Sequence, residues 1–460
     1  MKATLLTGGR LIDPAQGIDG AFDLLLTDGV VAAVGAPGSL REKAAAASGA
    51  RAGEELEVIE LEGKVVCPGL IDIHVHLREP GQEAKETVAT GVAAAVAGGF
   101  TRVACMANTL PANDSGWVTS VIVRAAEVAA LARVHPIGAI SKGLEGKELA
   151  PMGAMVAAGA VAVSDDGRPV SNAELMRRAL EYAQHFGIPV IQHAQDMDLT
   201  GDGVMHEGEW SARSGMPGIP GLAEDVMVAR DLLLVEETGG RYHLAHMSTA
   251  RATGLMREAK RRGLPVTCEV TPHHLLLTDQ AVVEAGFDAQ FKMNPPLRAR
   301  SDREALLAAL LDGTVDAIAS DHAPHTSDEK CFEFELAPFG ILGLETTLAV
   351  CLEHLVRPGH LALGRLVELL TSGPARVLGL SGGTLSPGSP ADVTVIDLER
   401  RWAIEPKQFR SKSRNTPFGG WPVTGAAVRT IVGGKTVFRL DAADPLAPEP
   451  PETPESPETP

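Results

Sequence analysis

Six potential metal ligands each lie at the end of an apolar run: His74, His76, Asp166, His193, His246 and Asp321. In an extended strand, residues two apart point to the same side, so His74 and His76 can reach one cation together. Imidazoles and carboxylates suit zinc or a similar divalent ion. A single His-x-His is more typical of a partly exposed strand face. Five runs that end in such residues instead indicate a metal-dependent hydrolase.

Two of the runs end in carboxylates with distinct expected roles. Val163-Ser-Asp165-Asp166 offers two, one of which could bridge two metals. Spacing alone does not choose between them; we prefer Asp166 as the ligand and place Asp165 in the loop. A carboxylate beside a metal-held water can bind the ion and accept a proton, so Asp321 is the candidate general base and acid. A helix cap is the plain alternative for Asp321, but a proline follows within three residues and no helix pattern begins there.

Several other polar residues predict an anionic substrate. Arg78 lies two residues after His76, so the same alternation could aim its guanidinium into the mouth of the barrel. Its planar fork matches a carboxylate, although a surface salt bridge with a neighbouring glutamate competes with this interpretation. Asn108 and Asn294 offer amide groups, yet each alone suits a turn equally well. We expect His325 near the substrate.

The elements that must position these residues alternate between short apolar strands and Ala- and Leu-rich helices. The expected strands span 71–76, 101–106, 134–140, 160–164, 188–193, 242–246, 265–270 and 315–320. Helical patterns cover 86–97, 118–132, 172–186, 222–237, 249–262 and 301–311. Such alternation predicts an α/β fold with a parallel sheet, and eight repeats predict a closed (β/α)8 barrel like that of TIM. In that fold active groups lie at the C-terminal ends of strands, where all six proposed ligands fall.

Both ends of the chain carry β-strand patterns, at 4–7, 22–34, 58–66, 393–397 and 429–438. The pair Gly433-Gly434 is typical of a tight hairpin turn. We therefore expect a small β-sandwich built from residues 1–66 and 379–440, flanking a barrel at 67–378. We expect residues 36–56 to form a mobile insertion, and 441–460 to be a disordered, acidic, Pro-rich tail.

Size, charge and cysteine usage narrow the class of protein. A chain of 460 residues suits a barrel of about 250 residues with a smaller domain. A net charge of −18 argues against nucleic-acid binding, and no uninterrupted apolar stretch suits a membrane span. The five cysteines are scattered with no Cys-x-x-Cys, and four lie in or beside apolar segments. Buried free thiols in the reducing cytoplasm are the expected state.

Five motifs resemble the longer, class I type of bacterial dihydroorotase in the amidohydrolase superfamily. They span 69–81, 107–109, 164–167, 269–275 and 320–325. The most specific are Leu-Arg-Glu-Pro-Gly in the first and Asp-His-Ala-Pro-His in the last, and the resemblance covers about residues 1–440. It implies a barrel with a flanking β-sandwich. It also implies reversible cyclisation of N-carbamoyl-L-aspartate to (S)-dihydroorotate in pyrimidine biosynthesis.

The same resemblance implies site roles, residue by residue. One or two zinc ions would bind the six ligands named above. The substrate would contact His76, Arg78, Asn108, Asn294, His325 and the backbone near Phe339-Gly340. Many relatives bridge their metals with a carboxylated lysine, but residues 160–167 contain no lysine, so Asp166 would take that place.

Two other functions compete with this interpretation. An allantoinase or hydantoinase-like cyclic amidase is the nearest, and Arg78 and the missing lysine weigh against it. An inactive scaffold for aspartate carbamoyltransferase would have lost ligands, whereas all six are present. Association of an active enzyme with that partner, and a homodimer, both stay open on the sequence.

Overall fold

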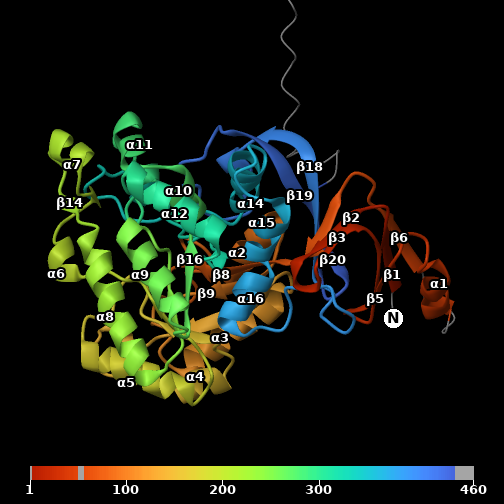
Figure 1. The fold of residues 1–460 in the computed structure, drawn as a ribbon, viewed down its shortest axis with the longest axis horizontal. Coiled ribbons are helices and arrows are strands. Elements are labelled where there is room, and N and C mark those ends of the chain that lie inside the picture. The colour runs from red at the N-terminus through yellow and green to blue at the C-terminus, as the bar shows by residue number, and fades with distance from the viewer. Residues whose placement is uncertain (1–2, 50–55, 441–460) are drawn as a thin grey trace, which may run out of the picture.

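Eight parallel strands form the centre of the computed structural model, which describes residues 3–49 and 56–440 (Figure 1). Each strand pairs with the next in the barrel. The first and last meet at a parallel bridge between Val75 and His322, beside a 2.8 Å bond from the backbone N–H of His76 to the carbonyl of His322. The strands are β8 (Leu70–Val75), β9 (Phe100–Cys105), β10 (Arg133–Gly138), β11 (Ala162–Ser164), β12 (Val190–Gln192), β15 (Tyr242–Leu244), β16 (Val266–Val270) and β17 (Ala317–Ile318). The predicted barrel is confirmed.

Helices cover the outside of the barrel, and the six predicted helical segments all form helices with similar ends. The longer helices are α2 (Val88–Ala97), α3 (Gly116–Ala129), α5 (Ala173–Gln184), α8 (Leu222–Thr238), α9 (Ala250–Arg261), α12 (Arg300–Asp312) and α15 (Leu363–Leu370). Side-chain caps explain several sharp starts: the Asn172 side chain accepts bonds from the backbone N–H groups of Glu174 and Leu175. Shorter helices lie in the connections: α4 (Met152–Ala157), α6 (Met197–Thr200), α7 (Glu209–Ser214), α10 (Pro272–Leu276), α11 (Asp279–Glu284), α13 (Ser327–Lys330), α14 (Thr347–Cys351) and α16 (Ser372–Leu378). No helix in the described ranges is long and apolar enough to cross a membrane.

The barrel interior is filled by apolar side chains, both small and large. Ala104, Ala162 and Ala317 belong to this interior cluster, which also includes Val377 and Leu378 of α16. A packed interior leaves the loops after the strands as the place where polar side chains can converge. The core therefore directs any active site to the C-terminal ends of the strands.

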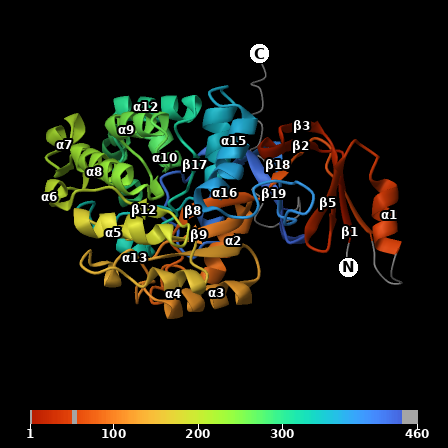
Figure 2. The same ribbon diagram turned by 60° about the horizontal axis from the view of Figure 1, so that its bottom comes forward.

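Strands from the two ends of the chain form two sheets beside the barrel (Figures 1 and 2). One sheet has the order β5-β4-β1-β6, and the other β20-β19-β18-β7-β2-β3. Apolar side chains from both sheets, such as Leu24, Val66 and Ile431, pack together, so the predicted sandwich is confirmed. The strands are β1 (Ala3–Thr7), β2 (Arg10–Asp13), β3 (Ile18–Ala21), β4 (Asp23–Thr27), β5 (Val30–Gly35), β6 (Leu56–Glu60), β7 (Val65–Pro68), β18 (Val393–Ala403), β19 (Pro422–Val432) and β20 (Lys435–Arg439).

Three local predictions at the chain ends need correction or completion. The expected strand at 58–66 is two strands, β6 and β7, in different sheets, because a turn with Gly63 at φ +74° separates them. The expected strand at 22–34 is a hairpin that turns at Asp28. Part of the expected mobile insertion is helix α1 (Arg41–Gly49), which lies against β1. The predicted hairpin turn at Gly433-Gly434 is confirmed, whereas the expected tail at 441–460 lies outside the described residues.

Candidate metal centre

The six predicted metal ligands come together in the structure. Each lies within three residues of the C-terminal end of a barrel strand, and all six are buried: His74, His76, Asp166, His193, His246 and Asp321. Two groups have ligand atoms that all lie within 4.8 Å of one another. One is formed by His74, His76 and Asp321, and the other by His74, Asp166 and His246.

In the first group, two histidine nitrogens face one carboxylate oxygen. Oδ1 of Asp321 lies 3.2 Å from Nε2 of His76 and 3.5 Å from Nε2 of His74. Asp321 has a positive φ of 49°, which turns the chain sharply after β17. This turn places its side chain beside the two histidines at the end of β8.

Asp166 faces both sides of the cluster. Its Oδ1 lies 3.4 Å from Nε2 of His74, 3.4 Å from Nε2 of His246 and 3.6 Å from Nδ1 of His193. Its Oδ2 lies 3.6 Å from Nε2 of His76. One carboxylate therefore reaches four imidazole nitrogens, as a ligand between two adjacent cations would.

The donor set fits a divalent metal ion. Nε2 of His74 and Oδ1 of Asp166 are buried without a hydrogen-bond partner among residues 3–49 and 56–440. Nδ1 of His193 and Nε2 of His246 are only 2.9 Å apart, so a proton or a cation must separate their lone pairs. Buried nitrogen and carboxylate ligands of this kind suit zinc.

The electrostatics of the cluster also favour a cation. Burial alone would raise the pKa of Asp321, but His74 and His76 hold it well below its ordinary value. Burial would likewise lower the pKa of His74, but the carboxylates of Asp166, Glu269 and Asp321 raise it well above its ordinary value. The anionic groups therefore dominate the field at His74, and a metal ion would satisfy the same field.

In three of the histidine ligands, the ring nitrogen that points away from the cluster has a hydrogen-bond partner of its own. Nδ1 of His74 lies 2.6 Å from Oε1 of Glu269, and Nδ1 of His76 lies 2.8 Å from Oδ1 of Asn108. Nε2 of His193 lies 2.7 Å from Oε1 of Gln195, which follows it by two residues. Sequence reasoning missed Glu269 and Gln195. The Glu269 side chain comes from β16, the one strand of the second barrel half without a predicted ligand.

The two neighbouring aspartates that follow β11 point to different places. Asp165 Oδ1 accepts bonds from the backbone N–H groups of Ile140 at 2.7 Å and Ser141 at 3.0 Å, and the Ser141 hydroxyl also donates to this carboxylate. Burial raises the pKa of Asp165 to about 6. The structure thus places Asp166, and not Asp165, among the histidines.

Arg78 lies near the cluster, but strand alternation does not explain its position. β8 ends at Val75, and Arg78 has a positive φ of 61°, so the side chain is aimed by a turn. Its Nε donates to the carbonyl of Pro324 at 3.1 Å, and its Nη2 lies 3.4 Å from Nε2 of His325. Burial lowers the pKa of Arg78 to about 10, with Asp321 and Asp166 acting in the opposite direction.

The remaining predicted substrate contacts lie in two places. Nε2 of His325 donates to the carbonyl of Phe339 at 2.8 Å, which joins Arg78, His325 and the Phe339-Gly340 segment. A Cβ at Gly340, where φ is +134°, would lie 2.8 Å from Cβ of Ala323, so only glycine fits this approach. Nδ2 of Asn294 donates to Gln195 at 2.7 Å, while its buried Oδ1 has no partner in the described part of the chain.

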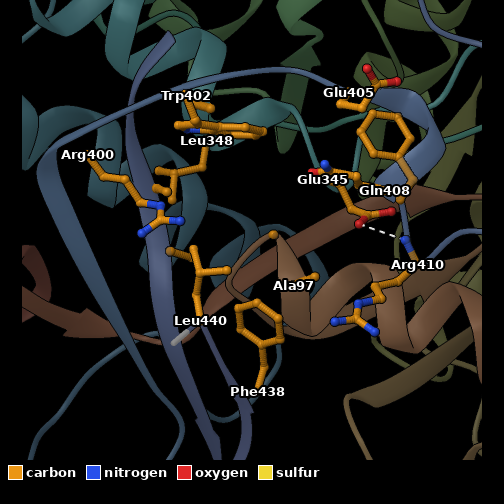
Figure 3. Close-up of a pocket in the computed structure, with 15 residues that line it drawn as sticks. Ala97, Glu345, Leu348, Arg400, Trp402, Glu405, Gln408, Arg410, Phe438 and Leu440 are labelled. Atoms are coloured by element: carbon orange, nitrogen blue, oxygen red, sulfur yellow. Dashed lines mark hydrogen bonds between the residues drawn. The ribbon is translucent and has the colours of Figure 1, made fainter. Parts of the chain in front are cut away.

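A separate cavity of about 110 Å³ lies between the barrel and the second sheet (Figure 3). Its lining includes Leu348, Trp402 and Phe438, and the Glu345 carboxylate, which accepts a 2.9 Å bond from the backbone N–H of Arg410. None of the residues lining this cavity belongs to the metal cluster.

Known proteins resemble this chain along nearly all of its length. A family model described as dihydro-orotase-like matches residues 63–252, and one described as the amidohydrolase family matches 335–438. The chain is 55% identical to the dihydroorotase of Anaeromyxobacter dehalogenans strain 2CP-1, over 95% of this chain and 98% of that protein. It is 51% identical to the dihydroorotase of Citrifermentans bemidjiense, over 95% and 99%. Among solved structures, L-hydantoinase from Arthrobacter aurescens matches with a TM-score of 0.82 and 26% identity, over 95% of this chain and 96% of that one.

The barrel, the flanking sandwich and the matched models define an amidohydrolase fold. The identity to curated relatives over almost the whole chain is more specific. The chain belongs to the dihydroorotase family.

Proposed function

We propose that this protein is a zinc-dependent dihydroorotase, which interconverts N-carbamoyl-L-aspartate and (S)-dihydroorotate in pyrimidine biosynthesis. The observation that carries the proposal is the buried cluster of four histidines and two aspartates near Arg78, in a chain 55% identical to a named dihydroorotase. The bond to be hydrolysed is an amide bond within the substrate ring, and Arg78 provides a partner for the substrate carboxylate.

Zinc at one or two adjacent positions per subunit fits the cluster. The two groups of ligands share His74, and Asp166 contacts both sides, so these residues could hold one ion or two. When bound, zinc activates a water molecule and polarises the ring amide carbonyl. Lysine is absent from residues 160–167, so Asp166 would take the place that the resemblance assigns to a carboxylated lysine in many relatives.

The chain's own residues then manage the proton and the substrate. Asp321 takes the proton of the attacking water and passes it to the departing amide nitrogen; cyclisation follows the same path in reverse. Arg78 neutralises the substrate carboxylate. His325 and the backbone at Phe339-Gly340 cover the ring, and the unpartnered Oδ1 of Asn294 accepts from a ring N–H.

We expect Arg78→Met to weaken substrate binding selectively. A lost charge-assisted hydrogen bond raises KM for dihydroorotate by about 10- to 100-fold. Dihydrouracil lacks the carboxylate, so any residual turnover of that compound stays unchanged. Steady-state kinetics on both compounds test this, with the exposed Arg124→Met as the matched control. An equal loss of activity on both substrates, or no loss on either, would show that Arg78 is not the partner of the substrate carboxylate.

The choice between this function and its alternatives rests on the same residues. Arg78 and the absence of a strand-four lysine favour dihydroorotase over an allantoinase or hydantoinase-like amidase. The presence of all six ligands favours an active enzyme over an inactive scaffold for aspartate carbamoyltransferase.

We keep the cytoplasm as the proposed location, because all five cysteines are free and only Cys331 is exposed. Homodimer formation, and association of the active enzyme with the carbamoyltransferase, stay as proposals to be tested by sedimentation of the purified proteins.

A further inference from the structure

Glu269 is a buried carboxylate that none of the steps above uses. It lies on β16 with 1% of its surface exposed. Its Oε1 is 2.6 Å from Nδ1 of His74 and also accepts a 3.3 Å bond from the backbone N–H of His246. Glu269 therefore contacts two ligand residues, His74 through its ring nitrogen Nδ1 and His246 through its backbone.

The other oxygen of Glu269 continues the chain of bonds into the barrel wall. Oε2 lies 3.2 Å from Nε2 of His243, and Nδ1 of His243 lies 2.8 Å from Oγ1 of Thr267. Thr267 and Glu269 are both on β16, while His243 is on the neighbouring β15. The residues Thr267, His243, Glu269 and His74 thus form one hydrogen-bonded series that ends at the cluster.

His74 differs in the type of this partner from His76 and His193. The outer nitrogens of His76 and His193 face the neutral amide oxygens of Asn108 and Gln195. His74 alone among these three faces a carboxylate. A carboxylate acceptor fixes the Nδ1–H tautomer, leaves the Nε2 lone pair for the metal, and makes the imidazole a stronger donor.

We propose that Glu269 is a positioning residue that sets the affinity of the metal site through His74, held in place by His243 and Thr267. The inference rests on the proposed metal site. The alternative is that Glu269 has a structural role alone and only links β16 to β15 in the barrel wall. The two differ in whether zinc affinity depends on the negative charge of Glu269.

Glu269→Gln removes that charge and keeps the bonds. The glutamine oxygen still accepts from His74, and its amide group donates to His243. The ring of His243 can switch tautomer, because the Thr267 hydroxyl can accept as well as donate. We expect a folded protein whose zinc affinity, measured by competition with a chromogenic chelator, is about 10- to 100-fold weaker. Glu258→Gln, which removes the same charge from an exposed position on α9, leaves the affinity unchanged.

Each outcome bears on the proposal. Folded Glu269→Gln protein that binds zinc within about twofold of the parent would overturn it. If that variant does not fold, Thr267→Val removes only the far end of the series; a loss of about three- to tenfold supports the proposal, and unchanged affinity contradicts it. Parent protein that binds no zinc at all would instead refute the proposed function, so the two failures are distinguishable.

Discussion

Asp321→Asn protein folds like the parent but turns over dihydroorotate about a thousandfold more slowly. Asparagine has nearly the same shape and tolerates the positive φ of 49° at this position, so the backbone is preserved. Its amide cannot accept the proton of the attacking water, and loss of a general base costs typically about 10²- to 10⁴-fold. Initial rates with (S)-dihydroorotate, beside circular dichroism of both proteins, measure the effect.

A matched control is available for this substitution. Asp28 has a φ of 55° and lies in the exposed turn between β4 and β5. Asp28→Asn makes the same chemical change in the same backbone conformation, and we expect normal turnover. Near-normal activity in the Asp321→Asn protein would exclude this carboxylate as the proton carrier.

Asp166→Asn loses metal, and activity with it. The carboxylate approaches imidazole nitrogens of His74, His193 and His246 within 3.6 Å, so it belongs to both sides of the site. A neutral amide oxygen is a weaker ligand, and removal of the bridging charge costs at least about 100-fold in zinc affinity. Zinc content after gel filtration, with chelator competition for the affinity, provides the measurement.

The adjacent residue gives the comparison for Asp166. Asp165→Asn keeps acceptor bonds to the backbone of Ile140 and Ser141 and does not touch the cluster. We expect it to retain zinc and most of its activity. A larger loss of zinc from the Asp165 variant than from the Asp166 variant would reverse the assignment.

The sequence predicted the barrel because its signals are local. Eight short apolar runs alternate with helical patterns, and residues at the ends of parallel strands must converge at one end of the barrel. The six clustered ligands followed from that rule and from their residue types, apart from the choice between Asp165 and Asp166. The split of 58–66 into β6 and β7 was missed, because both parts carry β-branched residues typical of a strand and the short turn at Gly63 decides their sheets.

Details that depend on long-range contacts were not accessible from the pattern. The alternation argument for Arg78 was wrong, since β8 ends at Val75, although the guanidinium still reaches His325. Glu269 carried no sign of its role, because its partners His74 and His243 lie far from it in sequence. The choice between Asp165 and Asp166 likewise required the loop after β10, which binds Asp165.

The most direct test of the central claim is turnover of the purified, zinc-loaded protein. (S)-Dihydroorotate is followed by loss of ring absorbance, with allantoin and dihydrouracil assayed under the same conditions. The metal cluster and Arg78 together predict selective hydrolysis of dihydroorotate. Faster turnover of allantoin or dihydrouracil would contradict the assignment, as would silence on all three compounds with zinc bound, both alone and with aspartate carbamoyltransferase added.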